Sequence, residues 1–316
     1  MTGVQSCVKV DIHIHILLSF LLLCYGGIAN FHCSRVHNES IQDLHSLLHF
    51  KQGVTSDPNG ALSNWYTSSH FCQWNGVICT SRSPLGVIEL YLSNQNLSGQ
   101  ISSSLDNLTF LEDLDLSKNN FIGPFPLRGC LQHLQFLYLY ENNMSGTIPD
   151  ALTNYSSLSI LYLTSNSLVG SITPKLGLLS NLECLRLDSN QLELRIPNEL
   201  GKLVNLEVFD LSHNRFSGEI PQTIFSVSYL LALWLGGNIL SGQTPRGIGN
   251  LTLTDLNLSE NNFRGAIEGL FDNLTQLEYL RLHGSELEGP IPASLGNLLN
   301  TRQLYLDNNN FQGSMP

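Results

Sequence analysis

The sequence predicts an α/β solenoid in which ten coils stack side by side and give their short strands to one parallel sheet. Between residues 87 and 316 a unit of the form LxxLxLxxNxLxGxIPxxLgxL returns every 24 residues, and twice after 23. Asn fills one column of that unit in eight of the ten copies, and Gln95 and Ser285 fill it in the other two. This period outweighs the two-domain estimate from a length of 316 residues, because repeat folds grow by adding coils that bury one another's apolar sides.

The LxL stretch of each unit predicts a short strand with one buried and one outward side. In residues 161 to 163, alternation directs Leu161 and Leu163 into the core and Tyr162 outward. The Asn that follows lies where the chain bends, and its amide can pair with backbone groups of neighbouring coils that would otherwise be buried without a partner. Because one buried Leu contributes only about 1.5–3 kcal/mol, no single position holds the arc together.

A glycine column after the Asn predicts a second bend, with a backbone torsion that other residues resist. Leu194 breaks this column in one unit. The glycines that fill it are Gly146, Gly170, Gly218, Gly242 and Gly289.

The N-terminus is typical of a secretory signal peptide. An apolar run from residue 14 to 24 follows Lys9, and it is shorter than the roughly 20 apolar residues of a membrane span. Small residues at Gly27 and Ala29 favour cleavage after Ala29, with an uncleaved anchor as the alternative. We therefore predict a signal peptide at 1–29, an N-terminal cap at 30–86 and repeats at 87–316, the last one incomplete. The expected location is extracellular or the cell surface, with plasma-membrane attachment if the native product is longer.

Asn-x-Ser/Thr sequons support passage through the secretory pathway and mark expected glycosylation sites. An Asn-rich and Ser-rich chain produces about half of them by chance, so they add to the signal peptide without replacing it. The sequons are at Asn38, Asn96, Asn107, Asn143, Asn154, Asn250, Asn257 and Asn273.

The segment before residue 87 predicts a cover for the first coil, whose apolar side would otherwise meet water. A Ser40-x-x-Asp43 pattern predicts a helix start, and the helix is expected to end at Gly53. Cys72 and Cys79, with six residues between them in a secreted chain, are interpreted as a structural disulfide, with a zinc site as the rival that lacks a second ligand pair. The apolar side of the helix is formed by Ile41, Leu44, Leu47 and Leu48.

Three further cysteines follow the signal peptide, so an odd number remains in the mature chain and at least one thiol is expected to lack a partner. The pairing of Cys33, Cys130 and Cys184 does not follow from the sequence. Cys184 is expected on the outward side of a strand, whereas Cys130 is expected to be packed. Neither is predicted to be reactive, because Arg186 alone adds positive charge near Cys184.

The charge balance is acidic, with 15 Lys and Arg against 26 Asp and Glu and a net charge of −11. A basic surface for phosphate backbones is therefore excluded as a main feature, and no nucleic-acid partner is predicted.

Three cap motifs carry a family resemblance. "LLHFK", "DPNGALSNW" and "FCQWNGVIC" stand ahead of 24-residue units with LxGxIP. Together they resemble plant-specific leucine-rich-repeat proteins, in particular the extracellular domains of receptor-like kinases. The resemblance covers the cap and all ten units. It implies a right-handed leucine-rich-repeat solenoid, a horseshoe or superhelix with a parallel concave sheet, a 3₁₀ or irregular convex side, and a helical N-terminal cap stapled by the disulfide.

By the same resemblance, the expected function is recognition of a peptide, protein or glycan ligand in plant defence or development, with a leucine-rich-repeat co-receptor as a further partner. The sequence reaches "FQGSMP" within a unit, without a C-terminal cysteine cap or kinase motifs. No enzyme activity and no cofactor are therefore predicted. Two alternatives stay open: a secreted inhibitor of a cell-wall-degrading enzyme, similar to polygalacturonase-inhibiting proteins, and a non-functional receptor fragment. The inhibitors usually carry paired Cys before the cap Trp, where this chain has Phe71 and Cys72.

One outward column predicts the contact surface. Tyr, Trp and Arg concentrate binding energy at interfaces, and adjacent members of the column are expected one strand apart. In this hypothesis Arg186 holds a ligand carboxylate and Trp234 covers an apolar group. The alternative is that aromatic residues simply suit exposed strands and that Arg186 pairs with Asp210 across strands. The central members are Tyr138, Tyr162, Arg186, Asp210 and Trp234, flanked by Phe136, Asp188 and His213.

Catalysis is not predicted for this column. Asp210 and His213 are close enough in sequence to suggest an acid–base pair. No motif supplies a Ser or Cys nucleophile with an oxyanion donor, and isolated Asp and His residues in repeats are usually solvated. No metal site is predicted either.

Overall fold

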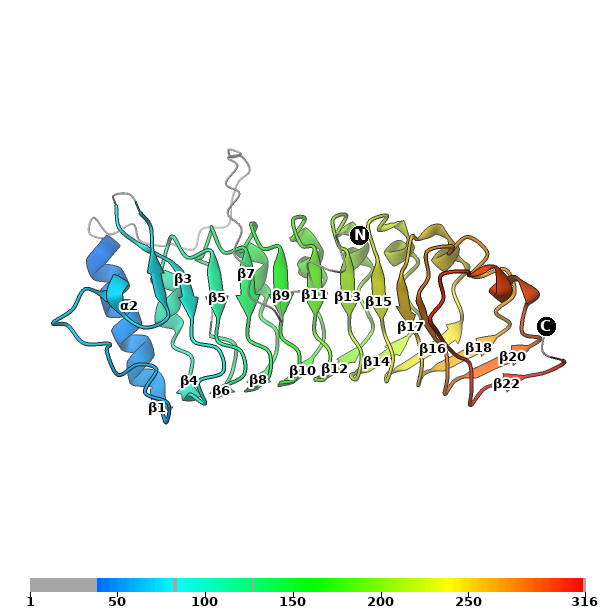
Figure 1. Cartoon of the computed structure of the whole chain (residues 1–316), viewed down its shortest axis with the longest axis horizontal. Helices are drawn as coiled ribbons and strands as arrows, with labels where there is room; N and C mark the ends of the chain where they lie inside the picture. The colour runs from blue at the N-terminus through cyan, green and yellow to red at the C-terminus, as the bar shows by residue number, and fades with distance from the viewer. Residues whose placement is uncertain (1–38, 82–83, 127, 315–316) are drawn as a thin grey trace.

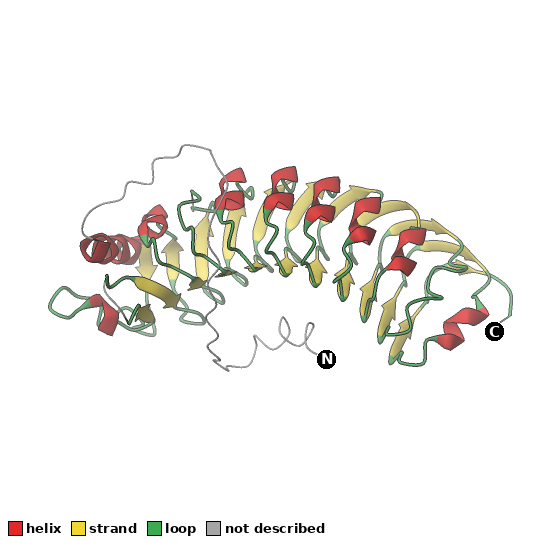
Figure 2. Cartoon of the chain, turned by 90° about the horizontal axis from the view of Figure 1, so that it is seen from above, coloured by secondary structure: helices red, strands yellow, loops and turns green. Residues whose placement is uncertain are grey.

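The computed structural model describes residues 39–81, 84–126 and 128–314, which form a curved solenoid (Figures 1 and 2). A parallel sheet lines the inner side of the arc, and short 3₁₀ helices lie on the outer side, as Figure 2 shows. The ten repeat strands are β3 (Val87–Tyr91), β5 (Asp113–Asp115), β7 (Phe136–Tyr138), β9 (Ile160–Tyr162), β11 (Cys184–Arg186), β13 (Val208–Asp210), β15 (Ala232–Trp234), β17 (Asp255–Asn257), β19 (Tyr279–Arg281) and β21 (Gln303–Tyr305). The predicted ten-coil solenoid with a concave parallel sheet is confirmed.

A second sheet runs along the return side of the coils, where the sequence predicted only an irregular chain. Its strands hold a single inward side chain each, as Leu168 does in β10, and this is too short an alternation to detect in one unit. The strands are β1 (Val54–Ser56), β4 (Ser98–Gln100), β6 (Asn120–Gly123), β8 (Asn143–Gly146), β10 (Ser167–Gly170), β12 (Gln191–Leu194), β14 (Arg215–Gly218), β16 (Ile239–Gln243), β18 (Asn262–Gly265), β20 (Glu286–Gly289) and β22 (Asn310–Phe311).

The outer side carries the 3₁₀ helices that the family resemblance implied. Several begin directly after a proline, whose fixed φ suits a helix start. They are η3 (Ser103–Asn107), η4 (Asp150–Asn154), η5 (Pro174–Leu178), η6 (Asn198–Lys202), η7 (Gln222–Ser226), η8 (Arg246–Asn250) and η9 (Ala293–Asn297). No helix among the described residues is long and apolar enough to cross a membrane.

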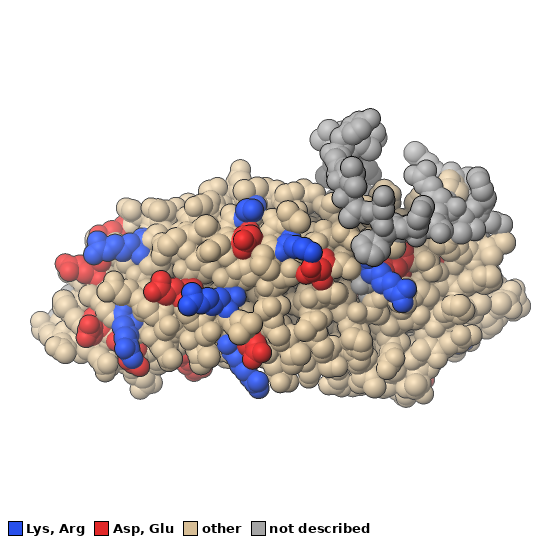
Figure 3. All heavy atoms as spheres, turned by 180° about the vertical axis from the view of Figure 1, so that it is seen from behind, with Lys and Arg blue, Asp and Glu red and all other residues tan. Residues whose placement is uncertain are grey.

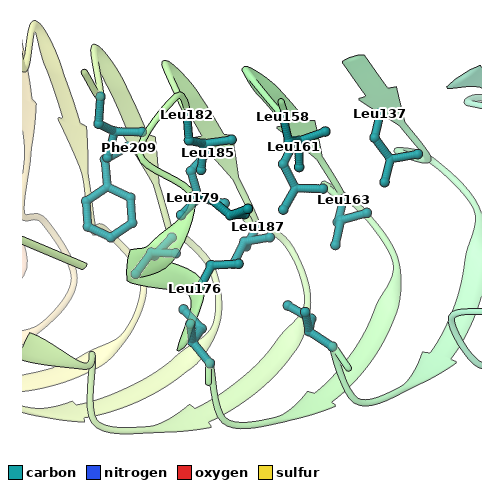
Figure 4. Packing of buried hydrophobic residues seen from close by; sticks show 14 of the residues in the cluster. Leu137, Leu158, Leu161, Leu163, Leu176, Leu179, Leu182, Leu185, Leu187 and Phe209 are labelled. Carbon is teal, nitrogen blue, oxygen red and sulfur yellow. The ribbon is translucent and has the colours of Figure 1, made fainter. Parts of the chain in front are cut away.

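The core is a continuous column of leucines between the two sheets and the helices (Figure 4). Leu161 and Leu163 from one coil meet Leu185 and Leu187 from the next, and all four are fully buried. Leu176 closes the space from η5. Replacing one such Leu by Ala costs about 2–5 kcal/mol in a packed core.

An Asn ladder ties the coils together as the sequence predicts. The Nδ2 group of Asn190 donates to the carbonyl oxygens of Leu163 and Leu187 at 2.9 and 3.1 Å, and its Oδ1 accepts from the backbone N–H of Leu168 at 3.0 Å. Seven other coils repeat this pattern of bonds across the coil boundary. Ser285 interrupts it, because its Oγ is buried with no hydrogen-bond partner.

The predicted glycine column has the left-handed backbone that favours glycine. Gly146 has φ of 81° and Gly170 has φ of 80°. Leu194 occupies the same column with φ of 72°, and its side chain is 59% exposed. The backbone of a leucine at this position is strained, and burial of its side chain does not offset the cost of that strain.

The cap covers the first coil with a helix and a disulfide. Helix α2 (Glu39–Gly53) begins before Ser40, so the predicted start is one residue late, and Ile41 is 49% exposed rather than part of the apolar side. Leu47 is fully buried, and Leu44 and Leu48 pack against the core. The disulfide between Cys72 and Cys79 confirms the pairing and excludes the zinc alternative. Cys79 ends β2 (Val77–Cys79), which pairs antiparallel with β3.

Candidate functional site

The predicted outward column lines up across the concave sheet. Tyr138 on β7 is in register with Tyr162 on β9, and Tyr162 with Arg186 on β11. Arg186 is in register with Asp210 on β13, and Asp210 with Trp234 on β15. We call these five residues the central strip. Figure 1 views the sheet that carries it.

The aromatic members of the central strip pack against one another. The rings of Tyr138 and Tyr162 meet edge to face with centroids 5.4 Å apart, a favoured arrangement. The guanidinium of Arg186 lies 5.4 Å from the Tyr162 ring centroid and 5.6 Å from that of Trp234, so it joins the two aromatic ends by cation–π contacts.

Arg186 is already paired with acids of its own chain. Its Nη2 lies 3.4 Å from Asp210 Oδ2, and its Nε lies 3.7 Å from Asp188 Oδ1. Burial lowers the pKa of Arg186, but the charges of Asp210 and Asp188 outweigh that effect and raise it above its ordinary value. The cross-strand pair considered as the alternative is therefore present, and contact of Arg186 with a ligand carboxylate stays a prediction.

Asp210 is held inside this network rather than beside a histidine. Its Oδ1 accepts from the backbone N–H of Ser212 at 3.0 Å. Burial and the charge of Asp188 raise the pKa of Asp210 despite Arg186. His213 lies in the next turn with φ of 52°, and its ring sits over Gly237, where an added Cβ would come within 2.5 Å of Nδ1. The hydrogen bonds described for Asp210 do not include one with His213, so these two residues do not form the suggested acid–base pair.

The central strip is more buried than the sequence predicts. Tyr138, Tyr162 and Asp210 are 7, 6 and 4% exposed, and the flanking Asp188 is 8% exposed. Neighbouring coils bring large side chains so close that they cover one another. The side chain of Arg186 keeps 30% of its surface, and Trp234, Phe136 and Tyr140 are half-buried. The accessible contact groups are therefore Arg186 and these three aromatic side chains.

A second apolar cluster lies on the concave side of the sheet. It consists of Tyr138, Ile160, Tyr162, Cys184, Val208 and Ala232, with Phe136, Tyr140 and Trp234 packed against it. Cys184 is fully buried in it, and Cys130 is half-buried. Cys33 lies outside the described residues. Among those residues no group of His, Cys, Asp and Glu side chains could hold a metal ion.

Two pairs of like-charged residues on this face were not singled out from the sequence. Glu89 on β3 is in register with Asp113 on β5, and Glu207 donates its backbone N–H to the carbonyl of Glu183 one coil earlier at 2.8 Å. We call them the first and second acid pairs. They stand in columns beside the central strip, and reading each outward column across the repeats would have revealed them.

The first acid pair is incompletely bonded. Asp113 Oδ2 accepts from the hydroxyl of Tyr91 at 2.7 Å, but Asp113 Oδ1 and Glu89 Oε2 are buried without hydrogen-bond partners. Burial, together with the charges of Asp115 and Glu89, raises the pKa of Asp113 to about 7. In the second pair, burial and the charge of Glu183 raise the pKa of Glu207.

The sequons fall on several faces of the arc. Asn38 lies outside the described residues. Asn257 lies on the concave sheet, and its Oδ1 accepts from the Ser259 hydroxyl at 2.7 Å. Asn96 and Asn143 lie beside or on the second sheet, Asn107, Asn154 and Asn250 lie in 3₁₀ helices, and Asn273 lies in a turn; glycosylation at all of them stays a prediction.

The sequence of the cap and of five repeats matches known protein families. Residues 40–80 match the leucine rich repeat N-terminal domain, and residues 133–155, 181–203, 205–227, 252–274 and 276–298 match the Leucine Rich Repeat. The chain belongs to the leucine-rich-repeat proteins. The matched repeats lie on the central and C-terminal coils, and the matched cap is the segment stapled by Cys72 and Cys79.

Curated relatives of this leucine-rich-repeat protein are plant receptor kinases. Phytosulfokine receptor 1 of Arabidopsis thaliana is 35% identical over 138 residues, which cover 43% of this chain and 13% of the receptor. The receptor kinase-like protein Xa21 of Oryza sativa subsp. japonica is 46% identical over 79 residues, or 23% of this chain and 8% of that protein. The matched segments are thus a small part of these relatives.

Solved structures of plant receptor ectodomains share the fold. The ectodomain of GASSHO1/SCHENGEN3 from Arabidopsis thaliana, in complex with CASPARIAN STRIP INTEGRITY FACTOR 2, has a TM-score of 0.84 and 34% identity, over 87% of this chain and 33% of that one. The Arabidopsis receptor kinase HAESA, in complex with the peptide hormone IDA and the co-receptor SERK1, has a TM-score of 0.65 and 30% identity, over 85% of this chain and 54% of that one. This leucine-rich-repeat protein therefore shares its fold with plant receptor ectodomains.

Proposed function

We propose that this leucine-rich-repeat protein is an extracellular recognition module that binds a peptide or protein ligand on its concave sheet. The observation that carries the proposal is the concave apolar cluster, whose half-buried members Phe136, Tyr140 and Trp234 stand beside a charged network on a rigid sheet. Aromatic side chains on a rigid platform give contact area at low entropic cost. The HAESA ectodomain, which has the same fold, is solved in complex with the peptide hormone IDA, and this supports a peptide as the class of ligand.

In this proposal the residues of the concave face divide into those that contact the ligand and those that support them. Phe136, Tyr140 and Trp234 touch the ligand because they keep accessible surface. Tyr162 and Asp210 hold Arg186 in place. The module has no catalytic step of its own, acts at the cell surface or outside the cell, and passes the signal through a second leucine-rich-repeat protein.

A peptide-display selection tests the proposal. Random 12-residue peptides are selected on the purified protein, and enriched peptides are measured against Phe136→Ala and Trp234→Ala. We expect each variant to weaken binding at least tenfold, because each removes an aromatic anchor. Tyr229→Ala is the matched control, since Tyr229 is 63% exposed and lies outside the strands of the concave sheet. The proposal would be refuted if the enriched peptides bound Phe136→Ala and Trp234→Ala as tightly as they bind the unaltered protein.

A further inference from the structure

The concave sheet carries negative charge that its own chain does not neutralise. Glu89 and Asp113 face each other across adjacent strands, and Glu183 and Glu207 occupy matching places on adjacent coils. None of the four forms an ion pair with a basic side chain anywhere in the described part of the chain. Like charges directly opposite one another destabilise a sheet, so both pairs cost folding free energy.

Two arginines of the same face are already paired with acids, whereas Lys118 lies over the Tyr140 ring, 5.5 Å from its centroid. Arg186 is paired with Asp188 and Asp210, and Arg281 Nη1 lies 2.9 Å from Asp255 Oδ1. The opposite, convex face differs, because basic and acidic side chains stand beside one another there (Figure 3). The carboxylates of the two acid pairs have no basic partner among the described residues, so they attract cations.

We propose that the ligand of the concave sheet is a peptide segment with two basic side chains, one received by Glu89 and Asp113 and the other by Glu183 and Glu207. This inference rests on the proposed function and adds the chemistry of the ligand. An ammonium or guanidinium group supplies the hydrogen-bond donors that Asp113 Oδ1 and Glu89 Oε2 lack. It also removes the repulsion within each pair, so relief of that repulsion adds to the free energy of binding.

The positions of the two pairs set the spacing of the basic residues. The first pair spans β3 and β5, and the second lies one residue before β11 and β13, four coils further on. At about 4.8 Å per strand the pairs are roughly 19 Å apart, and an extended peptide rises about 3.3 Å per residue. The two basic residues are therefore about six positions apart in a peptide that crosses the strands.

The part of the concave sheet between the two acid pairs determines which side chains suit the middle of the peptide, between its two basic residues. Phe136 and Tyr140 stand on and just after β7, between the two acid pairs, and both belong to the half-buried edge of the concave apolar cluster. Apolar or aromatic side chains near the middle of the peptide bury surface there.

Designed peptides test the inference on the full chain. Three probes with blocked ends are titrated by isothermal titration calorimetry: GKSFGFSKG, its acidic counterpart GESFGFSEG, and GSKFKFSGG, which has the composition of the first but two basic residues only two positions apart. We expect the first to bind at least tenfold more tightly than the acidic peptide and at least threefold more tightly than the closely spaced one. Raising the salt concentration should reduce the difference in affinity between GKSFGFSKG and the acidic peptide.

Charge-neutral variants locate the contact. Glu183→Gln with Glu207→Gln, and Glu89→Gln with Asp113→Asn, should each weaken binding of GKSFGFSKG at least threefold. Both changes remove repulsion, so the unfolding temperature should stay or rise, and lost binding cannot be ascribed to unfolding. Glu193→Gln with Glu199→Gln is the matched control, since these acids lie on β12 and η6, outside the concave sheet.

The outcomes separate this inference from the proposed function. Equal or tighter binding of the acidic peptide, no binding of GKSFGFSKG, or acid-pair variants that bind like the control would each overturn the inference. If an acidic peptide binds and depends on Phe136 and Trp234, the face binds peptides and only the assigned charge is wrong. If no peptide depends on either aromatic residue, the proposed function itself fails.

Discussion

The carboxylate of Asp43 on the cap helix accepts a hydrogen bond from the backbone N–H of Val87, the first residue of the first repeat strand, at 2.8 Å. Asp43 is 1% exposed and Val87 is fully buried, so this bond joins cap and repeat where water is excluded. It replaces the partner that a preceding coil would give to Val87, because β2 meets β3 only in the antiparallel direction. The helix thus serves as a substitute coil.

Asp43→Ala should destabilise the protein by about 1–3 kcal/mol, because a buried N–H would lose its partner. Chemical denaturation followed by circular dichroism measures the change. Asp272→Ala is the control, since Asp272 is exposed. A change of equal size in the control, or none in Asp43→Ala, would show that the bond does not anchor the cap.

Ser285→Asn should stabilise the array by about 1–2 kcal/mol. Asn309, one coil later, donates to the carbonyl oxygens of Leu282 and Leu306 at 2.8 and 3.0 Å. The Ser285 hydroxyl makes no such bonds. Gly284 already has the left-handed turn with φ of 66° that precedes the ladder residue, so the backbone is ready for the longer side chain.

The reverse change, Asn190→Ser, supplies the comparison for this prediction. It removes donors from a completely bonded position and should lower the free energy of unfolding by at least as much as Ser285→Asn raises it. If Ser285→Asn left the unfolding midpoint unchanged while Asn190→Ser lowered it, the C-terminal coils would not share in the cooperative unfolding.

Leu194→Gly should leave stability unchanged or raise it by about 1 kcal/mol, although a glycine in a strand usually weakens it. The left-handed φ of 72° costs a leucine about 1–2 kcal/mol, and its 59% exposed side chain contributes little burial in return. Gly146→Ala is the mirror experiment, because its φ is 81° and an added Cβ meets nothing closer than 3.6 Å. That variant should be destabilised by torsion alone, and thermal unfolding compares the two.

The repeat period predicted the parts of this molecule that every coil shares. The coils repeat ten times, and the Asn ladder and the glycine bend recur in most of them, so single exceptions such as Ser285 and Leu194 do not hide them. The second sheet escaped detection because Leu168 and its counterparts give each strand only one inward side chain. Relations between coils were predicted less well. The column of Tyr138, Tyr162 and Asp210 followed from the period, but its burial depends on the size of side chains on adjacent coils.

Stability should fall as the pH rises from about 4 to about 7, and Asp113 should account for a large part of that slope. Burial and the charges of Asp115 and Glu89 raise the pKa of Asp113 to about 7. The unfolded chain releases this proton near its ordinary value of about 4 and the folded chain holds it, so the native state is favoured below that value and loses the advantage as the pH approaches 7. The upper limit of the effect is about 4 kcal/mol.

Asp113→Asn tests this assignment because it keeps the shape and removes the titration. Unfolding midpoints in denaturant between pH 4 and pH 8 should decline less for the variant than for the unaltered protein, and the variant should be the more stable protein at pH 8. The other groups that face Asp113 are Glu89, Tyr91, Glu112, Asp115 and Tyr138, and Glu112 also has a raised pKa. The variant Glu112→Gln therefore measures separately how much Glu112 contributes to the pH dependence of stability. A bound basic peptide should flatten the slope of the unaltered protein, since a cation beside Asp113 favours its ionised form and returns the pKa toward its ordinary value. A slope identical in Asp113→Asn would assign the pH dependence to other carboxyl groups.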